Sequence, residues 1–144
     1  MLSRKADYGV RAMVELARQP ATTRTVVADI ARRQNIPAFY LAKIVPLLAR
    51  AGLLHTSLGA AGGICLAAPA DEISLYEIIE AIEGPWALNL CSIDPARCDQ
   101  HVGCTACTAW GEIQARLDES LKMIRLSDLT PMRTAARSQR QDSC

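Results

Sequence analysis

Four of the six cysteines in this chain of 144 residues lie between residues 91 and 107, with the spacing C-x6-C-x5-C-x2-C. Pro95 and Gly103 interrupt the stretch, and few apolar residues lie between Cys91 and Cys104, so the sequence predicts a loop here. A polar loop with four thiols usually takes its order from what the thiols bind. Thiolates are soft ligands that suit zinc or an iron–sulfur cluster, so the stretch predicts a metal site.

Other uses of these thiols stay open. Disulfide bonds are one alternative, although nothing else marks the chain as secreted. Inert thiols are a second, because a free cysteine can pack as a small hydrophobe. Zinc sites usually show two close pairs and a longer gap, whereas only Cys104 and Cys107 form a C-x2-C pair here. The spacing therefore favours an iron–sulfur site over zinc.

The net charge of +1 hides a strong segregation of charge along the chain. Residues 1–55 carry nine Lys/Arg and three Asp/Glu, residues 71–121 carry two and ten, and residues 122–144 carry five and two. A basic first third indicates a nucleic-acid partner, with a solvated basic face as the plainer alternative.

Neither a secretory signal nor a membrane span is expected. The first eight residues contain no apolar run, and residues 51–70, although uncharged, hold four glycines and Pro69 and fit a hairpin better than a lipid-spanning helix. We expect a soluble, cytoplasmic protein with no membrane partner. With two histidines and no phosphate-binding glycine loop before a helix, an enzyme acting on a small-molecule substrate is not expected.

The first third predicts three helices. They are expected over residues 3–18 and 26–34 and from about 38 to 51, with Thr25 as the cap of the second and residues 35–37 as a short turn. Two short helices joined by such a turn form a helix-turn-helix. Pro37 suits the first position of the third helix, Pro46 predicts a local kink within it and Gly52 ends it.

A glycine-rich hairpin is predicted directly after these helices. Its strands are Leu53–Thr56 and Ile64–Ala67, with residues 57–63 as the tip, so the unit is a winged helix-turn-helix. Cys65 lies in the second strand and is expected to pack in the core. The residues predicted to contact DNA are Thr25, Ala38, Phe39, Tyr40, Lys43, Arg50 and Gly59, with Lys43 and Tyr40 as candidates for base edges or phosphates and Thr25 for a phosphate.

The remaining chain predicts two more helices. Residues 74–83 form one, with Ser74 and Glu77 as a capping box. A long helix begins near Thr105, and Thr130-Pro131 closes it. Its apolar stripe is interpreted as a dimer contact, with ordinary core packing as the alternative. The stripe consists of Trp110, Ile113, Leu117, Leu121 and Ile124.

The order of these pieces resembles the bacterial winged-helix iron–sulfur regulators of the IscR, NsrR and RirA type, over roughly residues 2–130. The matching stretches flank the cysteines: Arg4-Lys5-Ala6-Asp7-Tyr8-Gly9-Val10-Arg11-Ala12, Asp29-Ile30-Ala31, Ile36-Pro37-Ala38-Phe39-Tyr40-Leu41, Leu48-Ala49-Arg50-Ala51-Gly52-Leu53-Leu54, Gly59-Ala60-Ala61-Gly62-Gly63-Ile64-Cys65-Leu66 and Leu126-Ser127-Asp128-Leu129.

The resemblance implies a homodimer that binds a double-stranded DNA operator. It also implies a [2Fe-2S] or [4Fe-4S] cluster held by Cys91, Cys98 and Cys104 beside the dimer helix. The fourth ligand is Cys107, or Asp7 from the partner subunit, or a group that is external or absent. The plain alternatives are a solvated or Arg-paired Asp7 and a surface His101.

The chain departs from this family at two places. Leu58 stands where arginine is common before the wing glycine, and the first cysteine gap is six where five is commoner.

These observations predict a mainly α fold with a small β-hairpin wing and a long dimerisation helix. The expected divisions are a DNA-binding domain over 1–70, a cysteine and dimerisation region over 71–130, and a disordered tail over 131–144. The predicted function is a cluster-sensing transcriptional regulator or repressor. The alternatives are a zinc-stapled winged-helix DNA-binding protein and a small electron-transfer or cluster-carrier protein.

Overall fold

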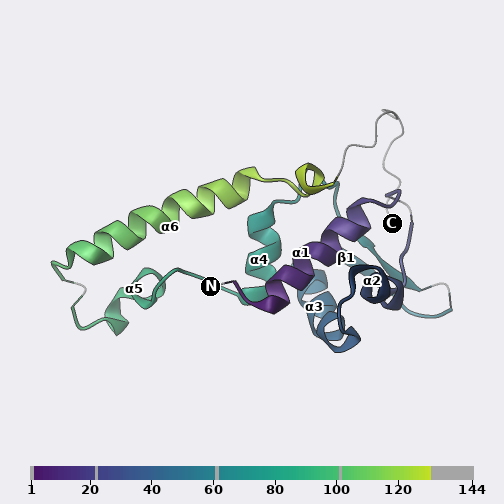
Figure 1. Cartoon of the computed structure of the whole chain (residues 1–144), viewed down its shortest axis with the longest axis horizontal. Coiled ribbons are helices and arrows are strands. Elements are labelled where there is room, and N and C mark those ends of the chain that lie inside the picture. Colours follow the sequence, from purple (N-terminus) through teal and green to yellow (C-terminus); the bar gives the residue numbers. More distant parts are fainter. Residues whose placement is uncertain (1, 22, 61, 101, 131–144) are drawn as a thin grey trace.

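The computed structural model describes residues 2–21, 23–60, 62–100 and 102–130 (Figure 1). It is mostly helical with one antiparallel two-stranded sheet, which confirms the predicted fold class. The elements in chain order are α1 (Arg4–Ala17), α2 (Val27–Gln34), α3 (Ala38–Arg50), β1 (Leu54–Ser57), β2 (Gly63–Leu66), α4 (Leu75–Glu83), α5 (Leu90–Ile93), η1 (Pro95–Arg97), α6 (Thr105–Met123) and η2 (Leu126–Leu129).

The turn between α2 and α3 is fixed by backbone geometry. Asn35 adopts the left-handed conformation (φ 51°), and the N–H of Ile36 donates to the carbonyl of Ala31 at 2.9 Å. This arrangement ends α2 and leads the chain at once into α3. Pro37 is the cap of α3 and not its first helical residue, one position from the prediction.

Gly52 ends α3 as predicted. It has φ +76°, its N–H donates to Ala49, and the N–H of Leu53 donates to the carbonyl of Leu48 at 3.0 Å. This pair of bonds is the Schellman arrangement, which favours glycine at the left-handed position. Pro46 lies inside α3 as expected.

The prediction that Thr25 caps α2 was wrong. The cap residue is Val26, and no side chain accepts a hydrogen bond there. Thr25 instead pairs with Ile64 of β2 through two backbone hydrogen bonds of 2.9 Å, and it is buried. Its extended backbone serves the edge of the sheet and is therefore not available to the helix.

The hairpin agrees with the predicted wing, displaced by one residue. Leu54 pairs with Leu66 and Ser57 with Gly63. Cys65 is buried in β2, so its predicted place in the core is confirmed.

One hydrophobic core joins α1–α3 to α4 and η2. Its most buried large side chains come from all five elements and from Ile73 before α4: Met13, Ile30, Leu41, Ile44, Leu48, Ile73, Ile78, Ile79 and Leu126. The predicted capping box at the start of α4 is present, with Ser74 and Glu77 bonded reciprocally. The core is continuous across residue 70, so the domain division there stays a prediction.

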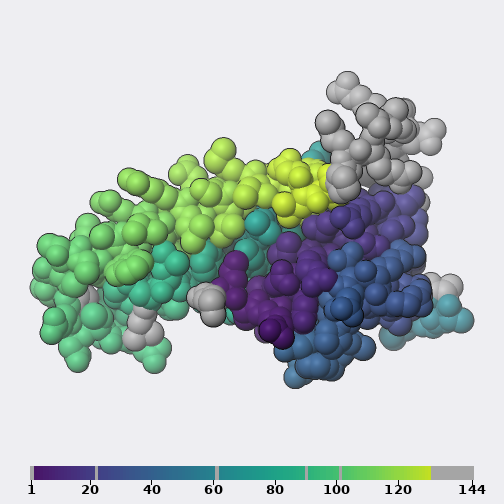
Figure 2. Space-filling model, in the orientation of Figure 1, coloured from purple at the N-terminus to yellow at the C-terminus, as the bar shows by residue number. Residues whose placement is uncertain are grey.

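α6 extends away from this core. Figure 2 shows the green α5–α6 region reaching to one side of the purple and blue N-terminal helices. The helix ends at Met123, earlier than predicted, and Leu126–Leu129 form a separate turn. The predicted tail over 131–144 lies outside the described residues.

The apolar stripe of α6 is divided. Trp110 and Ile113 are 43% and 47% exposed, whereas Leu121 is buried in its own chain and Ile124 lies beyond the helix. α4 contacts α6 within the same chain, and the carbonyl of Ile124 accepts the N–H of Leu75 at 2.9 Å, so the dimer contact stays a prediction whose exposed residues are Trp110 and Ile113. Among the helices described, none combines the length and apolar character needed to cross a membrane.

Candidate metal centre and nucleic-acid interface

The four cysteines lie in or directly beside α5, η1 and α6, and α5 contacts both η1 and α6. Cys91 is in α5, Cys98 follows η1, Cys104 caps the start of α6, and Cys107 lies in its first turn. The prediction of a loop was wrong in part, because α5 and η1 give this stretch two helical turns. Asp94 explains the second turn: its carboxylate accepts the N–H of Ala96 at 3.1 Å, with Pro95 at the first helical position.

The thiols lie close enough to influence one another. A hydrogen bond with the thiol of Cys91 raises the pKa of Cys107, as do loss of solvent and the nearby charges of Cys91, Cys104 and Cys98. All four side chains are half-buried. The chain thus gathers four soft sulfur donors at one place, and this donor set fits an iron–sulfur cluster or zinc.

The donors are gathered without preset ligand geometry. Among the described residues, no group of three or more His, Cys, Asp or Glu side chains is arranged to hold a metal ion. Asp7, the alternative fourth ligand, lies 3.7 Å from the guanidinium of Arg11 with its side chain 64% exposed, which matches the plainer prediction of an Arg-paired carboxylate. His101 lies outside the described residues.

A buried glutamine on α6 was missed by the sequence analysis. The side-chain carbonyl of Gln114 accepts the N–H of Leu88 at 2.8 Å, and its amide donates to Asp118 at 2.8 Å. A glutamine next to Ile113 on an amphipathic helix is normally expected to face solvent, so the sequence contained no signal for the burial of Gln114. Two residues before Leu88, the indole Nε1 of Trp86 is buried and has no hydrogen-bond partner within the part of the chain that the structure describes.

Four of the predicted DNA-contacting residues lie exposed along α3. They are Ala38, Phe39, Lys43 and Arg50. The ammonium of Lys43 is 5.9 Å from the centre of the Phe39 ring, which holds the cation at the helix surface. Tyr40 is half-buried and packs edge-on against Tyr8 at 5.0 Å, so its ring also joins α3 to α1.

The two remaining predicted contacts differ in accessibility. Gly59 is exposed at the wing tip with φ +101°, beside a fully exposed Leu58, and the N–H of Gly62 closes the turn onto its carbonyl at 2.9 Å. Thr25 is buried, so its hydroxyl is not presented at the surface. Thr25 was predicted to bind a phosphate because a helix was expected to start there, and α2 starts at Val27 instead.

A buried carboxylate ties α1 to α2. Glu15 accepts from Gln34 Nε2 at 2.8 Å and lies 3.3 Å from the guanidinium of Arg33 and 3.5 Å from that of Arg18. Arg11 also donates to the carbonyl of Gln34. Because Gln34 is the last residue of α2, these bonds hold α1 against the turn that leads into α3. The sequence analysis missed this role of Glu15.

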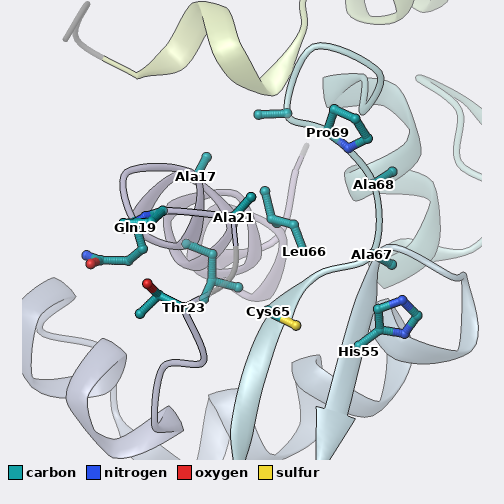
Figure 3. Close-up of a pocket in the computed structure, with 13 residues that line it drawn as sticks. Ala17, Gln19, Ala21, Thr23, His55, Cys65, Leu66, Ala67, Ala68 and Pro69 are labelled. Carbon is teal, nitrogen blue, oxygen red and sulfur yellow. The ribbon is translucent and has the colours of Figure 1, made fainter. Parts of the chain in front are cut away.

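A separate cavity of about 270 Å³ lies between the end of α1, the segment that follows it and β2 with its continuation (Figure 3). Its wall consists largely of small apolar side chains, including Ala17, Ala21, Ala67 and Ala68. The elements that line it carry none of the four clustered cysteines.

Comparison with known proteins gives consistent matches over nearly the whole chain. The family described as "Rrf2: Iron-dependent Transcriptional regulator" matches residues 2–131. "Protein rrf2" of Nitratidesulfovibrio vulgaris is 32% identical over 128 residues, 89% of this chain and 85% of that protein. The "HTH-type transcriptional regulator IscR" of Vibrio atlanticus is 31% identical over 134 residues, which cover 89% of this chain and 73% of that protein.

Two solved structures have similar folds. CymR (YrzC), described as the global cysteine regulator of B. subtilis, is 31% identical with a TM-score of 0.70, covering 90% of this chain and 95% of that chain. T. potens IscR is 28% identical with a TM-score of 0.71, covering 90% and 85%.

Proposed function

The chain belongs to the Rrf2 family of transcriptional regulators, and on this premise we propose that it is a homodimer whose affinity for operator DNA depends on an iron–sulfur cluster. Proteins of this family regulate transcription and are not enzymes. The proposal adds the cluster, the dimer and the dependence of DNA affinity on the cluster. It places the protein in the cytoplasm, where thiols stay reduced.

The observation that carries the proposal is the meeting of four cysteines from α5, η1 and α6. Cys91, Cys98 and Cys104 would hold the cluster. Cys107 is the fourth ligand we favour over Asp7 of the partner subunit, because its thiol lies close enough to that of Cys91 for a hydrogen bond that raises the pKa of Cys107, and because it lies about one turn from Cys104. A bound cluster would supply iron–thiolate bonds that fix α5 and η1 against the start of α6.

The DNA-binding surface is α3 with the wing beside it. Lys43 and Arg50 would neutralise phosphates, and the exposed ring of Phe39 would lie against base edges. Tyr40 acts chiefly by joining α3 to α1.

The two sites are connected through α6. Cys104 caps the start of α6 and Cys107 lies in its first turn, while Leu121 near the other end is buried. α6 contacts α4, which in turn contacts α3. Two DNA-binding heads in a dimer read half-sites at a fixed separation, so a change at the start of α6 alters affinity when it alters that separation.

The test is an anaerobic absorption spectrum of fresh protein, with iron and sulfide assayed on the same sample. Visible charge-transfer bands with matching iron and sulfide are expected. Duplexes selected from a random-sequence pool are then titrated with loaded and cluster-free protein, and their affinities are expected to differ.

Matched variants locate the ligands. Cys91→Ser and Cys104→Ser should lose the bands and the cluster-dependent difference in DNA affinity, while Ser92→Ala, a neighbouring non-thiol position, should keep both. Loss of the bands in Cys107→Ser but not in Asp7→Asn supports Cys107 as the fourth ligand. A colourless protein that contains zinc, or cluster-loaded protein that selects no DNA, contradicts the proposal and favours the zinc-stapled or the carrier alternative.

A further inference from the structure

Residues 84–89, the connecting segment, join α4 to α5 and determine where Cys91 lies. Its two ends are bonded to the helices beside it, because the N–H of Gly84 donates to the carbonyl of Glu80 at 2.9 Å and the carbonyl of Asn89 accepts the N–H of Ser92 at 3.3 Å. Residues 85–88 between them belong to neither α4 nor α5. Its position therefore depends on contacts with neighbouring elements. Leu88, three residues before Cys91, makes the contact that reaches α6.

Gln114 makes this contact with both ends of its amide group. The carbonyl accepts the N–H of Leu88 at 2.8 Å, the amide donates to Asp118 at 2.8 Å, and the residue is only 8% exposed. The carboxylate of Asp118 can only accept a hydrogen bond, so it orients the amide with its oxygen toward Leu88.

The place of Gln114 on α6 relates it to the cysteines. It follows Cys107 by seven residues, which is two helical turns, so both residues lie on the same face of α6. The bond from Leu88 to Gln114 therefore connects the chain just before Cys91 to the helix face that carries Cys107. Loss of this bond frees the Cys91 side of the site while leaving Cys104 and Cys107 in place.

We propose that Gln114 is a positioning residue that holds the connecting segment against α6 and so sets how firmly the cysteine site retains its cluster. This inference rests on the proposed function. Gln114 does not contact the cluster in this proposal; it acts through the backbone of Leu88 and the placement of Cys91.

The test uses Gln114→Met, which keeps the length and helix propensity of the side chain but removes the amide. The first readout is hydrogen exchange at the Leu88 amide in cluster-free protein. The second is the rate at which a chelator removes the visible absorbance from anaerobically loaded protein. Glu119→Met, an exposed position on the same helix, is the control.

We expect the Leu88 amide of Gln114→Met to exchange about fivefold to tenfold faster, the factor that one net hydrogen bond is worth. Chelator removal should accelerate by a similar factor, while core amides of α1 and α4 and the Glu119→Met control stay at wild-type values. The double variant Gln114→Glu/Asp118→Asn reverses the polarity of the side-chain pair but keeps an acceptor for Leu88, and it should restore both rates.

Two negative results have different meanings. If loaded wild type and Gln114→Met lose their absorbance at the same rate, or if Leu88 exchange is unchanged, the role of Gln114 is overturned and the proposed function stands. If wild-type protein takes up no iron and sulfide at all, the proposed function fails and this inference fails with it.

Discussion

Lys43 is the residue whose charge is best placed for DNA. It is exposed on α3 above the ring of Phe39, and it takes part in none of the ion pairs formed among the described residues. Lys43→Ala should weaken operator binding and lower the slope of log affinity against log salt by about 0.9 for each protomer bound. Fluorescence titrations over a range of salt concentrations measure both. Arg116→Ala removes one positive charge from α6 instead and should leave the slope unchanged; equal effects of the two variants would show that Lys43 contributes only net charge.

Glu15 is the residue that should matter most to the helix-turn-helix without touching DNA. Glu15→Ala removes a buried acceptor of Gln34 and of Arg33 at the end of α2. We expect a loss of about 1–3 kcal/mol in the free energy of unfolding, the usual range for a hydrogen bond to a charged group. Urea unfolding followed by circular dichroism measures it.

The control for Glu15 is its exposed partner. Arg18→Gln breaks an ion pair in which the arginine is 44% exposed, and such surface pairs contribute about 0–1 kcal/mol. If Arg18→Gln costs as much as Glu15→Ala, the bonds to α2 are not the source of the stabilisation.

Single residues were predictable where their type restricts their chemistry. The spacing of four thiols predicts a common ligand whatever the local structure, and that ligand stays a prediction. The exposure of Lys43 on α3 follows from the helical period alone. The structural roles of Thr25 and Gln114 were not predicted, for the same physical reason. A threonine or glutamine can serve at a surface, a cap or a buried hydrogen bond, and only the packed neighbours decide among these.

At the scale of elements, the start of α4 is bonded through the backbone to the segment that follows α6. Ser74 is buried, forms the capping box with Glu77 and pairs with Arg125 through the backbone, so one residue starts α4 and positions the end of α6. Ser74→Ala should lower the free energy of unfolding by about 1–2 kcal/mol. Thermal and urea unfolding measure the change.

A matched cap gives the comparison for Ser74. Ser3→Ala removes the cap of α1, whose residue is only half-buried and lies near the N-terminus. A smaller loss is expected there. If Ser3→Ala is the more damaging variant, burial of Ser74 does not make its cap the more stabilising of the two.

Elements with strong local signals were predicted and elements made by packing were not. Each of three local patterns favours a single secondary structure: the helical period of α1, the capping box of α4 and the glycine-rich tip of the hairpin. α5 and η1 are too short for a period, and η1 depends on the single turn capped by Asp94. The end of α6 at Met123 is likewise set by the contact between Ile124 and Leu75, which lie far apart in sequence.

For the whole molecule, α6 is organised in three consecutive parts. Cys104 and Cys107 lie at its start, Trp110 and Ile113 are exposed further along, and Leu121 near its end is buried within the chain. In the sequence, the apolar stripe runs without a break from Trp110 to Leu121, because core packing and contacts between chains both favour apolar residues. The sequence alone therefore does not separate the exposed part of the stripe from the buried part. The position of α4 against α6 does.

The dimer prediction follows from this division. Trp110→Asp/Ile113→Asp places two charges on the exposed part of the stripe without touching the core, so the fold should persist while the dimer dissociates. Sedimentation equilibrium should show a monomer, with the far-ultraviolet dichroism of wild type. Operator affinity should fall by about 100-fold or more, since each head then binds its half-site alone.

Two controls separate this outcome from general damage. Leu58→Asp changes an equally apolar and fully exposed residue at the wing tip, so it should remain a dimer. Leu121→Ala deletes a buried side chain at the core end of α6 and should cost about 2–5 kcal/mol of unfolding free energy before it affects association. A Trp110→Asp/Ile113→Asp protein that still sediments as a dimer would place the contact elsewhere on the chain, and α6 would then connect the cysteine site only to its own DNA-binding head.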